Sequence, residues 1–150
     1  MALNTVSPEP LRDLAALVVK EGVGLGGLCA AHRSWALALV WAGLPAQATP
    51  TERQINELLK AQLTGVAAFL DIDHVELRRW LVDTGWLTRD GYGREYRRVG
   101  LDALSAGQRE VADALAGIEP AAWAAEVRAA HRTRRDAGRA RWQAGSGTLA

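Results

Sequence analysis

The feature that most constrains this chain is a capped helical pattern in its centre that runs directly into a glycine-turned pair of strand-like segments. Asp73, with Glu76 three residues later, forms a capping-box-like pair of the kind that starts a helix. Gly85 supplies the left-handed residue that stops a helix. The helical pattern between these signals has one buried face, made of Leu77, Trp80, Leu81 and Thr84.

Two short strand-like runs follow this helix without a linker. Trp86 to Arg89 and Glu95 to Val99 flank Asp90-Gly91-Tyr92-Gly93, and the two glycines of that loop permit positive φ in a hairpin turn. A four-residue loop over 90–93 predicts that Leu87 lies opposite Tyr96, so that this pair packs onto the preceding helix.

Two further helices are expected before residue 73. The first begins at about Leu28 or Ser34 and ends at Ala42, before Gly43 and Pro45. Thr49 or Thr51 caps the second, whose apolar stripe contains Ile55, Leu58, Leu59 and Leu63. Three helices and a hairpin in this order predict a mainly α protein with a winged helix-turn-helix-like domain over residues 34–100.

Helical extensions are expected on both sides of this domain. Residues 1–33 form an N-terminal helical region, which opens at Ser7 and ends at the Gly-rich break over 22–27. Residues 101–150 form a C-terminal extension, in which Ser105 opens one helix and Pro120 is the first residue of the last one.

Composition excludes several classes of protein. The 150 residues carry 18 Lys and Arg against 17 Asp and Glu, so no global positive field draws the chain to nucleic acid or to anionic lipid. The longest apolar run, Trp35 to Leu44, is about half of a bilayer span, and the first residues lack a secretory signal pattern. We therefore expect a cytoplasmic protein that does not enter membranes.

No pattern of catalytic or metal-binding residues stands out. The chain has one Cys and three His, too few for a structural zinc site, and Cys29 is interpreted as a small buried apolar side chain. No G-x-S-x-G, phosphate-loop or H-E-x-x-H motif is present. We expect no cofactor, no metal and no enzymatic activity.

The central segment resembles a known bacterial family. The elements VWAGLP at 40–45, TERQINELL at 51–59, DHVELRRWLVDTGWLTR at 73–89 and EYRRV at 95–99 are similar, in order and spacing, to domain of unknown function number 2087. The match extends from about residue 34 to 99. It departs from the usual pattern in Trp80 and Trp86 and in a lengthened linker before Asp73. The resemblance implies a winged-helix-like module, often found beside ArsR-type DNA-binding domains, and it brings no catalytic residues.

Arginines form the candidate functional surface. The predicted nucleic-acid contacts lie on the third helix and on the hairpin, where guanidinium groups can bind phosphate bidentately: Arg78, Arg79, Arg89, Arg94, Arg97 and Arg98. The alternative interpretation is structural, with Arg78 and Arg79 paired to Glu76, to Asp83 or to the neighbouring helix, and the hairpin arginines in cross-strand ion pairs.

A second basic segment lies near the C-terminus. Arg128 to Arg141 contains six Arg and one Asp, a net charge of +5. The segment either solvates a helix end, or binds a partner or dimer helix, or contacts nucleic acid, and the residues do not decide between these.

Two functions follow as hypotheses. The first is a non-enzymatic, transcription-related protein that contacts double-stranded DNA through the third helix and the Arg-rich hairpin. The alternative is a protein-interaction or dimerisation module, a homodimer or the partner of a regulatory protein, without direct DNA contact. A continuous positive strip joining the hairpin, the third helix and the Arg128 to Arg141 segment would favour DNA, whereas isolated patches would favour the interaction module.

Overall fold

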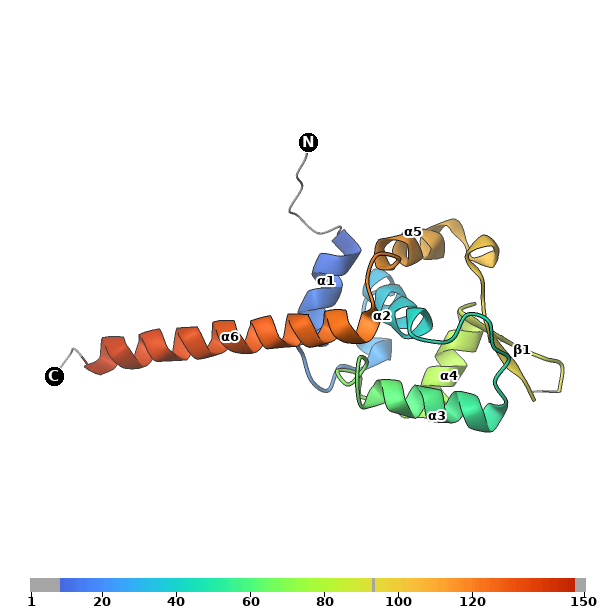
Figure 1. The fold of residues 1–150 in the computed structure, drawn as a ribbon, viewed down its shortest axis with the longest axis horizontal. Helices are drawn as coiled ribbons and strands as arrows, with labels where there is room; N and C mark the ends of the chain where they lie inside the picture. Colours follow the sequence, from blue (N-terminus) through green and yellow to red (C-terminus); the bar gives the residue numbers. More distant parts are fainter. Residues whose placement is uncertain (1–8, 93, 148–150) are drawn as a thin grey trace.

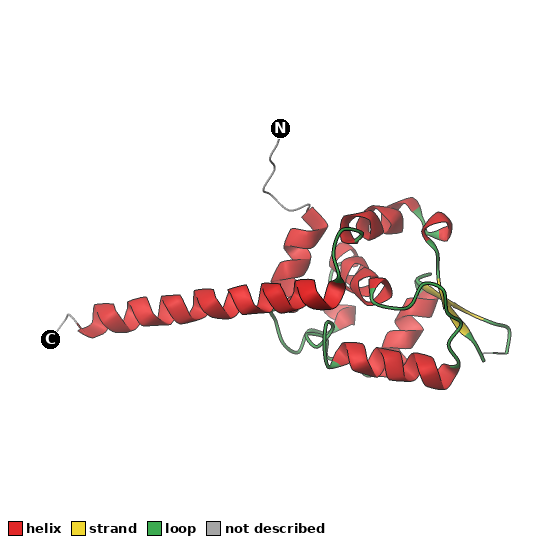
Figure 2. Ribbon diagram, in the orientation of Figure 1, coloured by secondary structure: helices red, strands yellow, loops and turns green. Residues whose placement is uncertain are grey.

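The computed structural model describes residues 9–92 and 94–147. This part of the chain is mainly helical, with one small antiparallel sheet of two strands (Figures 1 and 2). Ser7, the expected opening of the first helix, lies outside the described residues. The elements are α1 (Glu9–Val18), α2 (Ala30–Ala42), α3 (Glu52–Leu63), α4 (His74–Asp83), β1 (Leu87–Arg89), β2 (Tyr96–Arg98), α5 (Ala106–Leu115) and α6 (Pro120–Gly147).

The helix α2 is the centre of the molecule. Six successive residues, from Ala36 to Trp41, are buried, because α2 packs against α1, α4 and α5. A helix that is apolar on all sides is stable only in such a surrounded position, which explains why the longest apolar run of the sequence lies here. The helix begins at Ala30, between the two expected starts.

Helices α3 and α4 begin at the expected caps. The Thr51 hydroxyl accepts a hydrogen bond from the Gln54 amide, and the Gln54 side chain accepts one from the Thr51 amide, so that α3 opens with a complete capping box. Asp73 accepts from the Glu76 amide and opens α4. Gly85 ends α4 with a φ of 85°, the backbone conformation that favours glycine.

The linker between α3 and α4 is packed rather than free. Val66, Ala67, Phe69 and Leu70 are buried in the core. Leu70 also forms a short parallel bridge with Val23, of the Gly-rich break that follows α1. The linker is therefore a part of the core, and it ties the N-terminal region to the central helices.

The hairpin exists, but its register differs from the expected one. Leu87 pairs with Arg98, and Tyr96 pairs with Arg89 rather than with Leu87. The Asp90 carboxylate accepts hydrogen bonds from the amides of Tyr92 and Arg94, at 3.1 and 2.8 Å, and the Asp90 amide donates to the Glu95 carbonyl at 3.0 Å. Asp90 thus closes the strand pair instead of beginning the loop, so the turn lies one residue further along the chain.

One residue expected in the core lies at the surface. Cys29 is exposed, since it stands at the cap position that precedes α2, where the chain turns away from the apolar interior. The interpretation of Cys29 as a buried apolar side chain was wrong.

The C-terminal extension packs on the same core. Ser105 opens α5 with a second capping box, and Pro120 is the first residue of α6. Leu115 of α5 and Ala124 of α6 are buried together with residues from α1 and α2. A single apolar cluster therefore includes side chains from 1–33, 34–100 and 101–150. No helix of the described residues is long and apolar enough to cross a membrane.

Candidate nucleic-acid interface

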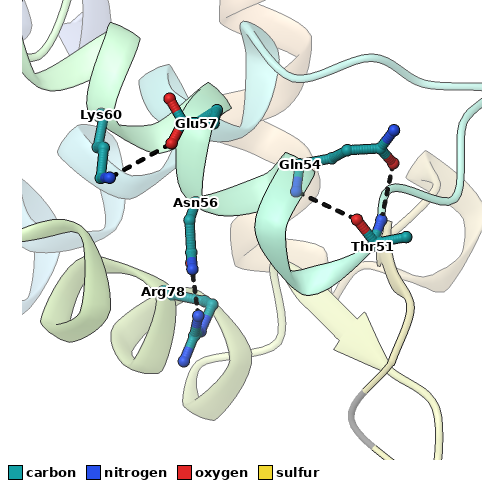
Figure 3. A network of polar contacts seen from close by, with 6 residues as sticks. All are labelled: Thr51, Gln54, Asn56, Glu57, Lys60 and Arg78. Carbon is teal, nitrogen blue, oxygen red and sulfur yellow. Dashed lines mark hydrogen bonds and ion pairs between the residues drawn. The ribbon is translucent and has the colours of Figure 1, made fainter.

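Arg78 lies in the junction between α3 and α4 (Figure 3). Its guanidinium donates to the side-chain oxygen of Asn56 and pairs with Glu52 at 3.3 Å, both on α3. It also lies over the ring of Tyr96, at 5.5 Å, and only 17% of its side chain is exposed. Arg78 therefore joins three elements, and its charge is already balanced within the protein. The alternative interpretation of Arg78, a pair with the neighbouring helix, is the one the structure shows.

Arg98 faces inward from the hairpin. Its guanidinium lies 3.9 Å from the ring centre of Trp41 and donates to the carbonyl oxygens of Leu44, at 2.8 Å, and Ala42, at 3.4 Å. Desolvation by burial lowers the pKa of Arg98 from its ordinary value. These contacts cover the last turn of α2, where carbonyl groups lack helical partners. Arg98 holds the hairpin to α2 and is not a free phosphate ligand.

The alternation of side chains between the two faces of β2 could have predicted that Arg98 faces inward. Side chains two residues apart share one face of a strand, so Arg98 lies on the same face as the buried Tyr96. Arg97, between them, is exposed.

Three of the predicted arginines remain available to a ligand. Arg79 on α4, Arg89 on β1 and Arg97 on β2 are exposed, and their side chains make no hydrogen bond or ion pair within residues 9–92 and 94–147. The expected pairing of Arg79 with Glu76 or Asp83 is therefore not found in this part of the chain.

Two surface hollows bring these arginines together. One, of about 240 Å³, lies between α4 and β1; its charged lining residues are Arg78, Arg79, Arg89 and Asp83. The other, of about 210 Å³, lies along β1 and β2; its charged lining residues are Arg89, Arg97, Asp90 and Glu95. Arg89 belongs to both hollows. Because Glu52 already balances Arg78, the first hollow has an excess of one positive charge, and the second has none.

Arg94 lies near the tip of the hairpin. Its guanidinium is 5.6 Å from the ring centre of Tyr92, a side chain that is 85% exposed. Arg94 is thus presented to solvent beyond the two hollows, on the part of the hairpin furthest from the core.

The second basic segment lies apart from the hairpin. Figure 1 shows α6 leaving the body at the end opposite to β1 and β2. Arg128, at the base of this segment, was not predicted to have an internal role, yet it donates to the carbonyl oxygens of Val18, Gly65 and Val66. The arginines of α6 and of the hairpin therefore do not form one continuous strip.

The described residues contain no group of three or more His, Cys, Asp or Glu side chains that could hold a metal ion. The chemistry that these hollows offer is the binding of anions by guanidinium groups.

Comparison with known proteins identifies the central segment. No curated protein and no solved structure matches the chain. Residues 30–98, which extend from the start of α2 to the end of the hairpin, match the model of a family described as an uncharacterized protein conserved in bacteria (DUF2087).

Proposed function

We propose that residues 30–98 form a winged helix that binds double-stranded DNA and serves in transcription regulation. The order α2, α3, α4 and hairpin supports this proposal. In winged helices the third helix enters the major groove, and the hairpin contacts the backbone beside it. Within residues 30–98 α4 is the third α-helix, and β1 begins four residues after α4 ends.

The observation that carries the proposal is the hollow between α4 and β1. Arg79, from the helix that would enter the groove, and Arg89, from the hairpin, line the same hollow. Neither side chain has a hydrogen-bond or ion-pair partner elsewhere in the described residues. A DNA backbone that passes between helix and hairpin would supply the missing anion to both arginines. Arg94 and Arg97 extend the same contact along the hairpin.

Fluorescence anisotropy with a labelled duplex tests this function. The double variant Arg79→Gln and Arg89→Gln is expected to bind at least about tenfold more weakly, because a charge-assisted hydrogen bond contributes roughly 1.5–3 kcal/mol. Removing an arginine from a phosphate also lowers the salt dependence, by about 0.9 per phosphate in the slope of log K against log salt. Arg98 is left unchanged, since its replacement would disturb the contact between the hairpin and α2.

A matched control keeps the overall charge change equal. Arg12 on α1 and Arg134 on α6 are exposed and lie outside both hollows. Their double replacement by Gln is expected to leave duplex affinity within about twofold of the original, because only charges near phosphate contribute to binding. Equal losses of affinity in both double variants, or no loss in either, would contradict the proposed interface.

A second candidate function is a protein-interaction or dimerisation module. The observation that favours it is the separation of the basic α6 from the hairpin, at opposite ends of the molecule (Figure 1). A module of this kind is expected to show a dimer or a larger complex in light scattering coupled to gel filtration. A monomer at all concentrations between about 1 and 100 µM would count against self-association, because the dissociation constant of any dimer would then lie above this range.

A further inference from the structure

No other helix or strand of the described residues packs against the outer part of α6. Near its beginning Ala124 is buried and Trp123 and Val127 contact the core. From Arg132 to Gly145 all positions are exposed apart from the half-exposed Gly138. At 1.5 Å per residue this stretch projects roughly 20 Å. The helix can be followed in Figure 1 as the orange and red rod that leaves the body.

Four arginines and one tryptophan share one face of this helix. Arg128, Arg132, Arg135, Arg139 and Trp142 follow each other at intervals of four and three residues. Side chains at these intervals lie on the same side of an α-helix, within an arc of about 80°. We call these five residues the α6 stripe. Arg134 and Arg141 lie on a different side of the helix.

Arg128 attaches the inner end of the α6 stripe to the body of the protein. It donates to the carbonyl oxygens of Gly65 and Val66, which follow the C-cap residue of α3, at 2.9 Å each. The next two arginines, Arg132 and Arg135, line a hollow of about 290 Å³ at the base of the projection. Arg128 lines this hollow too. Its remaining charged or titratable lining residues are Lys20, Glu21 and His131, so the arginines and the lysine outnumber the one carboxylate. The stripe therefore begins in a basic hollow of the body and continues outward along the free helix.

The α6 stripe lacks an anionic partner within the described part of the protein. Arg132, Arg135 and Arg139 make no hydrogen bond or ion pair in residues 9–92 and 94–147. Like charges three and four residues apart repel each other and destabilise an isolated helix. An anion with several charges in a row would remove this repulsion along the whole stripe.

The end of the stripe indicates which anion fits. Trp142 is 73% exposed, and it continues the line of arginines. A row of cations beside a flat ring is what a single-stranded nucleic acid needs from a protein, because its phosphates follow the cations while an unpaired base stacks on the aromatic side chain. A membrane surface fits less well, since the side of the helix opposite the stripe has no large apolar side chain that could insert into lipid. That side carries Thr133, Ala137, Arg141 and Ala144.

We propose that the α6 stripe binds single-stranded nucleic acid, with Arg132, Arg135 and Arg139 on successive phosphates and Trp142 stacked on a base. This site is separate from the duplex contact proposed for α4 and the hairpin, and it does not depend on that contact.

The test uses the full chain and a fluorescein-labelled oligo-dT of about 20 nucleotides, a length that exceeds the site size of a single binding domain. The double variant Arg135→Gln and Arg139→Gln is expected to lose roughly tenfold or more in affinity and about 1.4 in the salt slope. The control, Arg134→Gln and Arg141→Gln, makes the same charge change on the same helix away from the stripe. It is expected to stay within about twofold, because these side chains do not face the strand.

Trp142 provides a second, charge-independent readout. Trp142→Ala is expected to weaken oligo-dT binding by roughly fivefold to a hundredfold, and Trp142→Phe by much less, since stacking needs a ring rather than an indole. Circular dichroism confirms that the variants keep their helix content.

Several results would overturn the proposal. These are absence of oligo-dT binding by the original chain, equal losses of affinity in the two double variants, or an unchanged affinity of the Trp142→Ala variant. Loss of a dimer in light scattering on replacing Arg135 and Arg139, without oligo-dT binding, would assign the stripe to an acidic surface of a second copy instead. The Arg79 and Arg89 double variant is expected to keep full oligo-dT affinity, so failure of the duplex contact and failure of the α6 stripe are distinguished.

Discussion

Replacing Trp86 by alanine is expected to lower the free energy of unfolding by about 3–5 kcal/mol, because the transfer energy of a large aromatic side chain adds to that of the cavity it leaves. Trp86 is 1% exposed and directly follows the glycine that ends α4. Its ring lies 5.6 Å from the ring of Trp41, and its carbonyl accepts a hydrogen bond from the Val99 amide at 3.0 Å. The side chain therefore fills the space between α2, α4 and the hairpin.

Urea unfolding followed by circular dichroism measures this change in stability. Small proteins have a total stability of about 5–15 kcal/mol, so the variant is expected to unfold at a much lower urea concentration with a similar slope. Trp86→Phe keeps an aromatic ring in the same place and serves as the conservative control, with a smaller decrease in stability. A change below about 1 kcal/mol for alanine would show that the site collapses freely or that Trp86 contributes little packing.

The elements that the sequence predicts well are those that depend on local chemistry. Thr51, Asp73 and Ser105 cap their helices as expected, because a short side chain with an oxygen satisfies amide groups that the first turn leaves free. Gly85 stops α4 with positive φ for an equally local reason. The order of three helices and a hairpin follows from such signals alone.

The register of the hairpin could not be predicted from the alternation of apolar residues. Leu87 and Tyr96 are both buried, as expected, but the pattern does not say which residue begins the turn. The Asp90 carboxylate decides this by accepting two amides of the loop. The presence of an Asp at this position does not show whether the residue ends a strand or opens a turn, because Asp is common in both places.

The division of the arginines into structural and available ones is also non-local. Arg98 bonds to carbonyls more than fifty residues earlier in the chain, and Arg78 bonds to α3 across the packed linker. Alternation along the strand places Arg98 on the same face as the buried Tyr96, but no spacing in the sequence reveals the distant partners of Arg98 or Arg78. What remains of the predicted site is Arg79, Arg89 and Arg97, together with Arg94 near the tip of the hairpin. Their exposure was expected, but the hollows that Arg79, Arg89 and Arg97 line depend on how α4 packs beside the hairpin.

The Gly-rich break illustrates the same limit. Its glycines predict that α1 ends, and Gly22 has a φ of 65°. They do not predict that Val23 pairs with Leu70 or that Leu25 is 2% exposed. Leu25 packs into the core and Val23 pairs with the linker between α3 and α4, so the break holds α1 against the rest of the body.

The second large effect is expected at Arg128, where α6 is attached to the body. Arg128→Met keeps the length of the side chain but removes its hydrogen bonds to Val18, Gly65 and Val66. The carbonyl oxygens of Val18, at the end of α1, and of Gly65 and Val66, just after α3, then lose their common donor. A hydrogen bond to a charged group contributes roughly 1.5–3 kcal/mol, but Arg128 is only half-buried and water replaces part of these bonds, so we expect stability to fall by about 2–4 kcal/mol in total. Desolvation by burial lowers the pKa of Arg128, as expected for a cation held against the body.

Arg132→Met is the matched control, because Arg132 lies one turn further along the same helix and its side chain makes no hydrogen bond or ion pair among the described residues. Its stability is expected to change by no more than about 0.5 kcal/mol. Limited proteolysis complements the urea midpoint, since removal of the anchor exposes the backbone between Pro120 and Arg128 to cleavage while α3 and α4 stay protected. If both variants unfold at the same urea concentration, the three carbonyl bonds do not attach α6, and the attachment must then come from the packing of Trp123, Ala124 and Val127 alone.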